Sequence, residues 1–275
     1  MKNDIVPIGS VPRSIFAEVL AAITPYHVAL LGIEDVEGED TIHYVGSGTM
    51  LSASSKSFIL TAAHVWEDVR RYKEIGLCLS DQLHDTRVPT ASIMPLVSYD
   101  PTNAAWGPDL AFLAVPTLLA LAGQFGRRLL GFDEAKSQAC EVLPDRQRGF
   151  AAIVGAPASV SAIDSHFAGL RAGPWIGGID EVHPEQEHGG FDYVDVGVDK
   201  YHTPGVPTHF GGVSGGSLWQ FVLHRSTEGE VYWRGAAHLL GVAIRQLDIP
   251  FGRCVVRCHG PKSLYHQGAR ILGVT

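Results

Sequence analysis

Short apolar runs separated by turn residues fill most of the chain, and this pattern constrains its fold more than any other feature. Runs rich in Val, Ile and aromatic residues recur from His27–Ile33 to Leu110–Val115, and again from Gly149–Gly155 to Cys254–Cys258. Gly, Pro, Asp and Asn cluster between them. Such spacing is typical of strands joined by turns. We therefore expect an all-β protein of antiparallel strands, arranged as a sandwich or as barrels.

Two segments depart from the strand pattern. Arg13–Ile23 has the periodicity of a short amphipathic helix, and residues 117–139 are rich in Leu, Ala and Arg, which predicts a partly helical stretch near mid-chain. We interpret the second segment as the connection between two β halves, residues 24–116 and 140–260, within one domain that spans residues 1–275.

Composition narrows the range of partners and compartments. Hydrophobic residues make up 45% of the 275 residues and charged residues 18%, as in an ordinary globular protein. The net charge of −8 and the lack of a Lys/Arg-rich run argue against nucleic acid as a partner. Pro25 and His27 interrupt the apolar stretch Val19–Ile33, so no membrane span is expected. Residues 1–16 lack the pattern of a signal peptide, which favours the cytoplasm.

The cysteines give no sign of a disulfide framework or of a metal site. Cys78, Cys140, Cys254 and Cys258 are few and irregularly spaced. Cys254, Cys258 and His259 lack a second ligand pair, so small buried side chains are the better interpretation than metal ligands. We expect no metal and no cofactor.

One serine lies in a glycine cluster, Gly-Gly-Val-Ser-Gly-Gly at residues 211–216. Each glycine costs about 0.5–1 kcal/mol of chain entropy relative to alanine, so the cluster indicates a tight turn or a close approach. A serine hydroxyl held there would have backbone N–H groups beside it. Ser214 is therefore a candidate nucleophile, although a simple turn between strands would also explain the glycines.

A serine nucleophile needs a base and a group that orients the base. Ile59–Val65 is an apolar segment that ends in small residues and presents His64, and Pro108–Val115 places Asp109 before an apolar strand. Histidine suits the base because its ordinary pKa, about 6.5, lies close to neutral pH. Taken singly, such a histidine is more often a packed residue, and such an aspartate more often a cap.

Together these stretches resemble the chymotrypsin/trypsin-like serine proteases. That family carries Thr-Ala-Ala-His-Cys, Asp-hydrophobic-Ala-hydrophobic and Gly-x-Ser-Gly-Gly motifs in this order. The chain matches them at Thr61–His64, Asp109–Phe112 and Gly212–Gly216, while Gly46–Leu51 and Leu240–Val242 resemble two further strands of the family. The resemblance covers about residues 24–260.

The resemblance implies two packed six-stranded antiparallel β-barrels, a chymotrypsin-like double barrel, with the active site between them and a short N-terminal helix in addition. It implies a serine endopeptidase that hydrolyses peptide bonds of protein substrates. Ser214 would be the nucleophile, His64 the base and Asp109 the orienting acid, and the N–H groups of Gly212 and Ser214 would form the oxyanion hole.

The chain also departs from the family. Val213 replaces the aspartate that pairs with a new N-terminus in the digestive enzymes, so activation by clipping is not expected. Val65 replaces the usual cysteine, which resembles a disulfide-free intracellular bacterial branch. The expected substrate pocket residues are Thr208, His209, Ile244, Arg245 and Gln246. Threonine at 208 gives no charge for Lys or Arg, which disfavours trypsin-like cleavage after these residues. Because a cytosolic protease needs a limit on indiscriminate cleavage, narrow specificity or a regulatory protein partner is expected.

Two other interpretations stay open. Gly-x-Ser-x-Gly is also the nucleophile elbow of α/β-hydrolases, in which Asp248 and His259 or His266 would follow the serine. Strand–helix alternation is missing through most of the sequence, which disfavours an esterase of that fold. The other interpretation is a catalytically silent module with the protease fold, for which an intact Ser/His/Asp set would be unnecessary.

Overall fold

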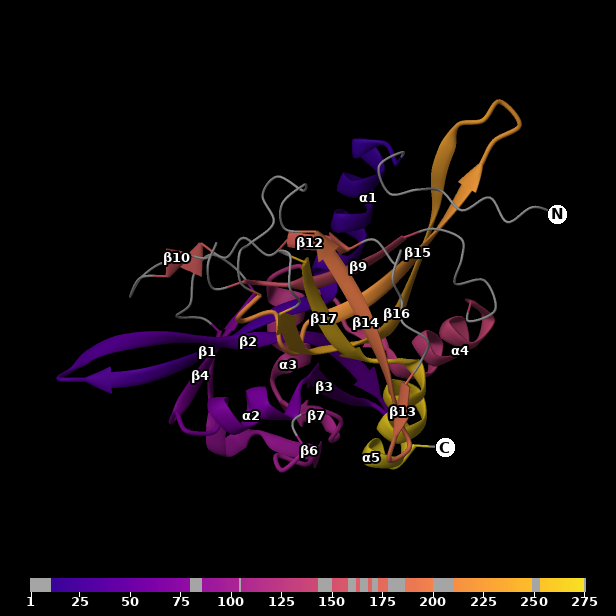
Figure 1. The fold of residues 1–275 in the computed structure, drawn as a ribbon. Coiled ribbons are helices and arrows are strands. Elements are labelled where there is room, and N and C mark those ends of the chain that lie inside the picture. Colours follow the sequence, from indigo (N-terminus) through magenta and orange to yellow (C-terminus); the bar gives the residue numbers. More distant parts are fainter. Residues whose placement is uncertain are drawn as a thin grey trace.

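The computed structural model describes residues 11–79, 86–103, 105–142, 150–157, 162–163, 168–169, 173–177, 186–199, 210–248 and 253–274. Most of these residues lie in or beside two antiparallel sheets, which Figure 1 shows packed against each other. The all-β class with a short N-terminal helix is thereby confirmed. The two sheets are consistent with the chymotrypsin-like pair of barrels, although each hydrogen-bonded path holds seven strands where six were expected.

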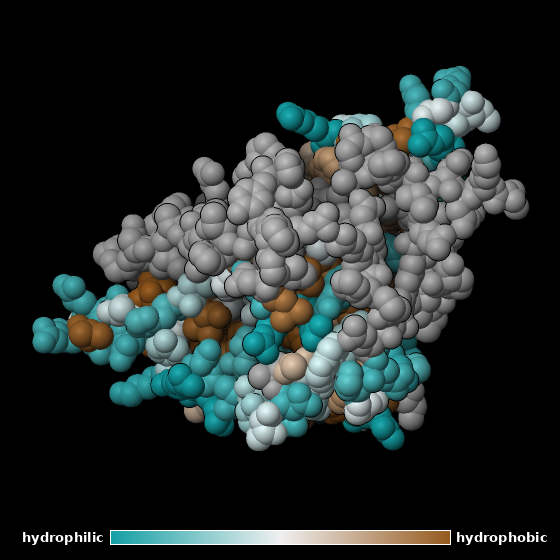
Figure 2. Space-filling model, in the orientation of Figure 1, coloured by the Kyte–Doolittle hydropathy of each residue, from teal (hydrophilic) through white to brown (hydrophobic). Residues whose placement is uncertain are grey.

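The first sheet draws its strands from the N-terminal half. Its order is β5-β4-β1-β2-β3-β7-β6, and β8 adds to β2 as a parallel partner. The strands are β1 (His27–Val36), β2 (Glu39–Ala53), β3 (Lys56–Thr61), β4 (Glu74–Cys78), β5 (Arg87–Pro89), β6 (Met94–Tyr99), β7 (Asp109–Ala114) and β8 (Leu130–Gly131). The far ends of β1 and β2 project from the body as a hairpin with a mostly hydrophilic surface (Figures 1 and 2).

The second sheet draws its strands from the C-terminal half, in the order β12-β9-β15-β16-β17-β14-β13. A separate two-stranded sheet pairs β10 with β11. The strands are β9 (Phe150–Gly155), β10 (Ala162–Ile163), β11 (Ala168–Gly169), β12 (Gly173–Gly177), β13 (Gln186–His188), β14 (Phe191–Asp199), β15 (Ser217–Arg225), β16 (Val231–Asp248) and β17 (Arg253–His259).

Helices cover the ends and the junction of the sheets. The expected helix Arg13–Ile23 is α1, and the segment between the halves contains α3 and part of α4. The helices are α1 (Arg13–Ile23), α2 (Ala63–Val69), α3 (Leu118–Gln124), α4 (Phe132–Val142) and α5 (Gly268–Leu272), with one-turn segments at Thr24–Tyr26 and Thr90–Ser92 and a π-helical turn at Ser263–Gln267. Within the described residues, no helix is long and apolar enough to cross a membrane.

The largest apolar core joins the two sheets. Leu60 and Phe112 of the first sheet pack in one cluster with Trp219 and Phe221 of the second, and α1, α4 and α5 add side chains to the same cluster. All four of these residues are almost wholly buried. Because both sheets contribute side chains to one core, strands β3 and β7 are held at a fixed place beside the second sheet.

Candidate active site

The site begins where strands β3 and β7 run antiparallel. Thr61, the last residue of β3, lies opposite Ala111, near the start of β7. In an antiparallel pair the end of one strand lies beside the start of the other. His64 follows β3 as the second residue of α2, and Asp109 is the first residue of β7. The register therefore brings these two side chains together, although 45 positions separate them in the chain.

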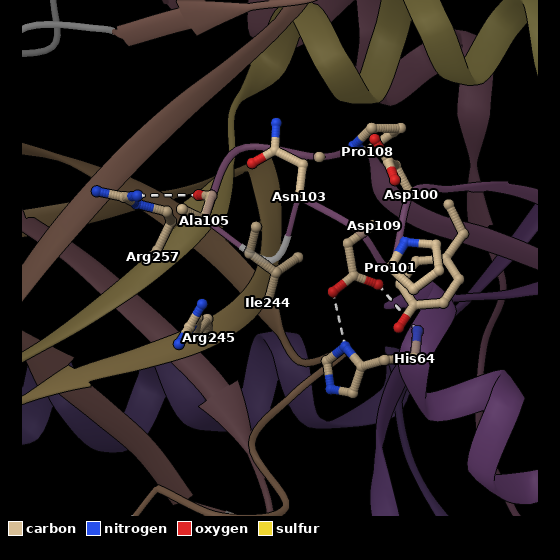
Figure 3. A pocket seen from close by; sticks show the side chains of 12 residues that line it. His64, Asp100, Pro101, Asn103, Ala105, Pro108, Asp109, Ile244, Arg245 and Arg257 are labelled. Carbon is tan, nitrogen blue, oxygen red and sulfur yellow. Dashed lines mark hydrogen bonds and ion pairs between the residues drawn. The ribbon is translucent and has the colours of Figure 1, made fainter.

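Asp109 holds His64 at two points. Its Oδ2 lies 2.6 Å from His64 Nδ1, and its Oδ1 accepts the backbone N–H of His64 at 2.9 Å (Figure 3). Because the carboxylate accepts at Nδ1, that nitrogen carries the proton, and Nε2 is left as the basic atom of the ring. The His64 side chain keeps 32% of its surface exposed and Asp109 only 16%. His64 therefore has the tautomer and the access that a general base requires.

The surroundings of His64 raise its pKa above the ordinary value of 6.5. Burial acts in the opposite direction and disfavours the imidazolium. The hydrogen bond and negative charge of Asp109, with a smaller contribution from Asp68, together outweigh the effect of burial. The result is an imidazole that accepts a proton more readily than a free histidine.

A second histidine, His259, supports Asp109 from the other sheet. It ends β17 and is completely buried, and its Nε2 accepts the backbone N–H of Asp109 at 3.0 Å. Burial lowers the pKa of His259 to about 4, so the ring is neutral at pH 7 and able to accept. The sequence considered His259 only as a weak metal ligand or a hydrolase base. The contact depends on the packing of one sheet on the other, which no local motif encodes.

The serine loop, residues Gly211–Gly216, packs against the point where β3 ends and α2 begins. The carbonyl of Ser214 accepts the backbone N–H of Ser47 at 2.9 Å. A Cβ on Gly215 would lie 2.0 Å from Thr61 Oγ1, and the glycine has a φ of +81°. Only glycine allows this approach. The loop and the turn that carries His64 are thus in direct contact.

Ser214 itself is half-buried, and no hydrogen bond between its Oγ and His64 Nε2 occurs among the described residues. Catalytic hydrogen bonds are often long in a structure without substrate. The structure places both residues at one junction and leaves the ring nitrogen Nε2 and the Ser214 hydroxyl without a fixed partner within the part of the chain that it describes.

The backbone N–H groups of the loop fall into two sets. Those of Val213, Gly215 and Gly216 donate to the carbonyls of Phe210, Ala243 and Val213, at 3.0, 2.7 and 2.7 Å. Within the described residues, the N–H groups of Gly211, Gly212 and Ser214 meet no acceptor. Two unused donors on either side of Val213 are what a site for a developing oxyanion needs.

A cavity of about 240 Å³ opens beside His64 and Asp109. Figure 3 shows Ile244 and Arg245 of β16 on one wall and the segment before Asp109 on the other. The lining residues are His64, Tyr99, Asp100, Pro101, Asn103, Ala105, Gly107, Pro108, Asp109, Ile244, Arg245 and Arg257.

A buried arginine fixes the wall of this cavity. Arg257 donates to both carboxylate oxygens of Asp195 at 2.8 Å and to the carbonyl of Ala105 at 3.1 Å. Its guanidinium also lies 3.8 Å from the centre of the Trp106 ring. Bidentate pairing and stacking on an aromatic face are the contacts that suit arginine best. The segment that leads into Asp109 is therefore attached to the second sheet.

The structure describes three of the five expected pocket residues. Thr208 and His209 lie outside the described residues. Ile244 is buried and Arg245 exposed, and both line the cavity. Gln246 accepts the N–H of Phe210 through its Oε1 at 2.8 Å, which ties the start of the serine loop to β16. A role for these residues in substrate recognition stays a prediction.

Val213 and Val65, which depart from the motifs of the resembled family, both pack in apolar clusters. Val213 is 1% exposed and lies in an apolar cluster with Phe210, Leu218 and Leu240. Val65 is equally buried and belongs to the core around β3 and β7. Buried apolar side chains thus stand at the two positions where the resembled family has an aspartate and a cysteine.

Metal and thiol chemistry find no support in the described residues. No group of three or more His, Cys, Asp or Glu side chains is arranged there to hold a metal ion. Cys78 and Cys258 are buried, and burial raises the pKa of the Cys258 thiol, which keeps it protonated and unreactive.

Comparisons with known proteins found solved structures that are similar to this chain but no matching sequence family. No family model matches the chain, and no curated protein matches it. A serine endoprotease from Yersinia pestis has a TM-score of 0.48 at 15% identity, over 96% of this chain and 68% of that one. A chain from a study of the coupled folding and binding of the intrinsically disordered VPg protein of Sesbania mosaic virus has a TM-score of 0.40 at 13% identity, over 94% and 92%.

Proposed function

We propose that the protein is a serine endopeptidase that cleaves peptide bonds of protein substrates. The observation that supports this best is the two-point attachment of Asp109 to His64, which leaves His64 Nε2 without a partner among the described residues. The loop of Ser214 contacts the same turn at Thr61 and Ala62. In this mechanism Ser214 Oγ attacks the peptide carbonyl carbon while its proton moves to His64 Nε2. The tetrahedral oxyanion is held by the N–H groups of Gly212 and Ser214.

His64 then returns the proton. The imidazolium, stabilised by Asp109, donates it to the leaving amine as the C–N bond breaks, and an acyl-enzyme on Ser214 results. A water molecule that gives its proton to His64 attacks the acyl carbon. The second oxyanion then collapses, the bond to Ser214 Oγ breaks, and Oγ takes the proton back from His64 as the acid product leaves. Each step uses the same base and the same pair of N–H donors.

The fold disfavours the α/β-hydrolase interpretation. An α/β-hydrolase has a mostly parallel sheet with helices between the strands, whereas here all strand pairs except β2–β8 are antiparallel. His259, one of the two histidines that could be the base in that alternative, is buried and accepts a hydrogen bond from the backbone of Asp109.

A fluorophosphonate probe tests the proposal. The wild-type protein is expected to be labelled at Ser214 and to cleave an unfolded protein such as casein, whereas Ser214→Ala and His64→Ala lose labelling and cleavage. Ser137→Ala, an exposed serine on α4, and His224→Ala, on the distant β15–β16 hairpin, are matched controls that keep both. Wild-type protein that stays unlabelled, while a known serine hydrolase is labelled in the same tube, would contradict the proposal.

A further inference from the structure

The carbonyl of Gly212 is held by two hydroxyl groups from β2. Tyr44 Oη donates to it at 2.9 Å, and Ser47 Oγ donates to it at 2.8 Å. A hydroxyl has one proton to give, and a carbonyl oxygen has two lone pairs, so the two donors saturate this acceptor. Ser47 Oγ also accepts the N–H of Ala156 at 3.0 Å, which ties the cluster to the end of β9.

Ser47 supports the loop on both sides of Val213. Its Oγ contacts the carbonyl of Gly212, and its backbone N–H donates to the carbonyl of Ser214 at 2.9 Å. Gly212 and Ser214 are also the residues whose N–H groups are proposed to form the oxyanion hole, and neither N–H meets an acceptor within the described residues. Fixing both carbonyls fixes the planes of the peptide units that follow them, and therefore restricts the backbone around Ser214.

Tyr44 adds a steric restraint to its hydrogen bond. Gly212 has a φ of +91°, and a Cβ there would lie 2.1 Å from Tyr44 Cε1 and 2.9 Å from the carbonyl oxygen of Ala156. The aromatic ring therefore rests directly on the glycine backbone. A flip of the peptide between Gly212 and Val213 would remove the acceptor from both hydroxyl groups. Burial raises the pKa of Tyr44, so its hydroxyl stays protonated and remains a donor over the working range of pH.

We propose that Tyr44 and Ser47 are positioning residues, which hold the loop of Ser214 in its working shape in place of an ionic partner for residue 213. This inference rests on the proposed peptidase function and deepens it. Neutral hydroxyl donors on a strand of the first sheet order the loop, so the loop needs no newly cut N-terminus to hold its shape. Val213 contributes by packing into the apolar cluster below the loop.

The test compares Tyr44→Phe, Ser47→Ala and the double variant with wild type. Tyr72→Phe is the matched control, because Tyr72 packs beside Gly32 of β1 and on His43, and within the described residues no hydrogen bond joins it to the loop. Two quantities are measured: the second-order rate of fluorophosphonate labelling, and the pKa of the hemiketal oxyanion formed with a ¹³C-labelled alanyl chloromethyl ketone. The second quantity reports stabilisation of the oxyanion itself, and a purely structural role would not change it.

We expect each single variant to label about 10-fold more slowly and the double variant about 10²-fold or more, with a raised oxyanion pKa in each. Tyr72→Phe is expected to match wild type. Variants that lose thermal stability but keep the wild-type labelling rate and oxyanion pKa would overturn the inference. If Ser47→Ala does not fold, Tyr44→Phe alone decides. Failure of the wild type itself to label would instead overturn the proposed function.

Discussion

At the scale of single residues, the site depends on where protons are placed. Asp109 accepts at His64 Nδ1 and at the His64 backbone, so it selects both the tautomer and the orientation of the ring. His259 accepts from the backbone of Asp109 and is neutral because burial lowers its pKa to about 4. The protons on His64 and His259 are therefore placed by contacts between different elements, α2 with β7 and β7 with β17.

The direction of the His64 pKa shift predicts the acid limb of the pH profile. In the proposed mechanism His64 must be neutral to accept the proton of Ser214, and its pKa lies above 6.5, so kcat/KM is expected to rise with pH through an apparent pKa above that value. Asp109→Asn removes the charge that raises the pKa and should lower activity about 10⁴-fold. The measurement is kcat/KM on a casein-derived peptide from pH 5 to 9. An acid limb that is centred below 6.5 would contradict this expectation.

How much of the site can be read from sequence depends on the kind of contact. His64, Asp109 and Ser214 lie in short motifs, and the structure brings their segments to one junction. Tyr44 and His259 belong to no motif of this kind. Their contacts with Gly212 and Asp109 span 168 and 150 positions, and they arise only when one sheet packs on the other.

At the scale of elements, the serine loop is held by packing where other proteins could use charge. Val213 lies in the apolar cluster of the second sheet, and Gly215 donates to the carbonyl of Ala243 on β16 at 2.7 Å. In return, Ala243 donates to the carbonyl of Gly216 at 2.7 Å. The loop is therefore an extension of the sheet rather than a free connection.

Placing an acid at position 213 should therefore destabilise the protein. The side chain is 1% exposed and surrounded by apolar groups, so the carboxylate of Val213→Asp would be buried without a partner, at a cost of about 3 kcal/mol or more. Urea unfolding measures this cost. Val213→Thr, of nearly the same volume, is the control and should lose less. If Val213→Asp were as stable as wild type, the packing role of Val213 would be contradicted.

Sequence patterns predicted the elements with unequal success, for physical reasons. The helix Arg13–Ile23 was predicted with its observed bounds, because its apolar residues Ile15, Val19 and Ile23 recur on one face and are buried. The long strand β16, Val231–Asp248, is harder to read as one element, since Arg234 to Ala236 interrupt the apolar pattern in an exposed part of the strand. These residues form a bulge between the pairs Phe221–Ala237 and Leu223–Trp233, where Gly235 has a φ of +87°, and pairing with β15 continues on both sides of it.

At the scale of the whole molecule, the two sheets are joined by a shared core and by polar contacts. Arg257 of β17 contacts both Asp195 of β14 and the backbone of Ala105, which belongs to the first half. Tyr193 Oη donates to the carbonyl of Trp106 at 2.7 Å. The geometry of the site thus depends on the docking of one half against the other, which explains why motifs alone could not provide it.

The same burial that neutralises His259 predicts how the stability of the whole protein depends on pH. His27 on β1 and His259 on β17 are both buried, and desolvation lowers the pKa of each to about 4. In the unfolded chain both would titrate near 6.5, so between pH 6.5 and 4 the unfolded state binds more protons and the free energy of unfolding falls as the pH falls. From pH 6.5 to 5 the loss is about 1.5 kcal/mol for each histidine.

The contribution of His64 has the opposite sign and a different window. Its pKa is raised by folding, so its stabilisation is fully present below pH 6.5 and is lost only as the pH rises through the folded value. Urea unfolding at pH 6.5 and 5 therefore reports on His27 and His259 rather than on His64. His27→Gln and His259→Gln should each reduce the difference in the free energy of unfolding between the two pH values by about 1.5 kcal/mol, whereas His224→Gln, on the β15–β16 hairpin, should leave it unchanged. A free energy of unfolding that stays constant from pH 6.5 to 5 would mean that these two histidines are not held neutral by the fold.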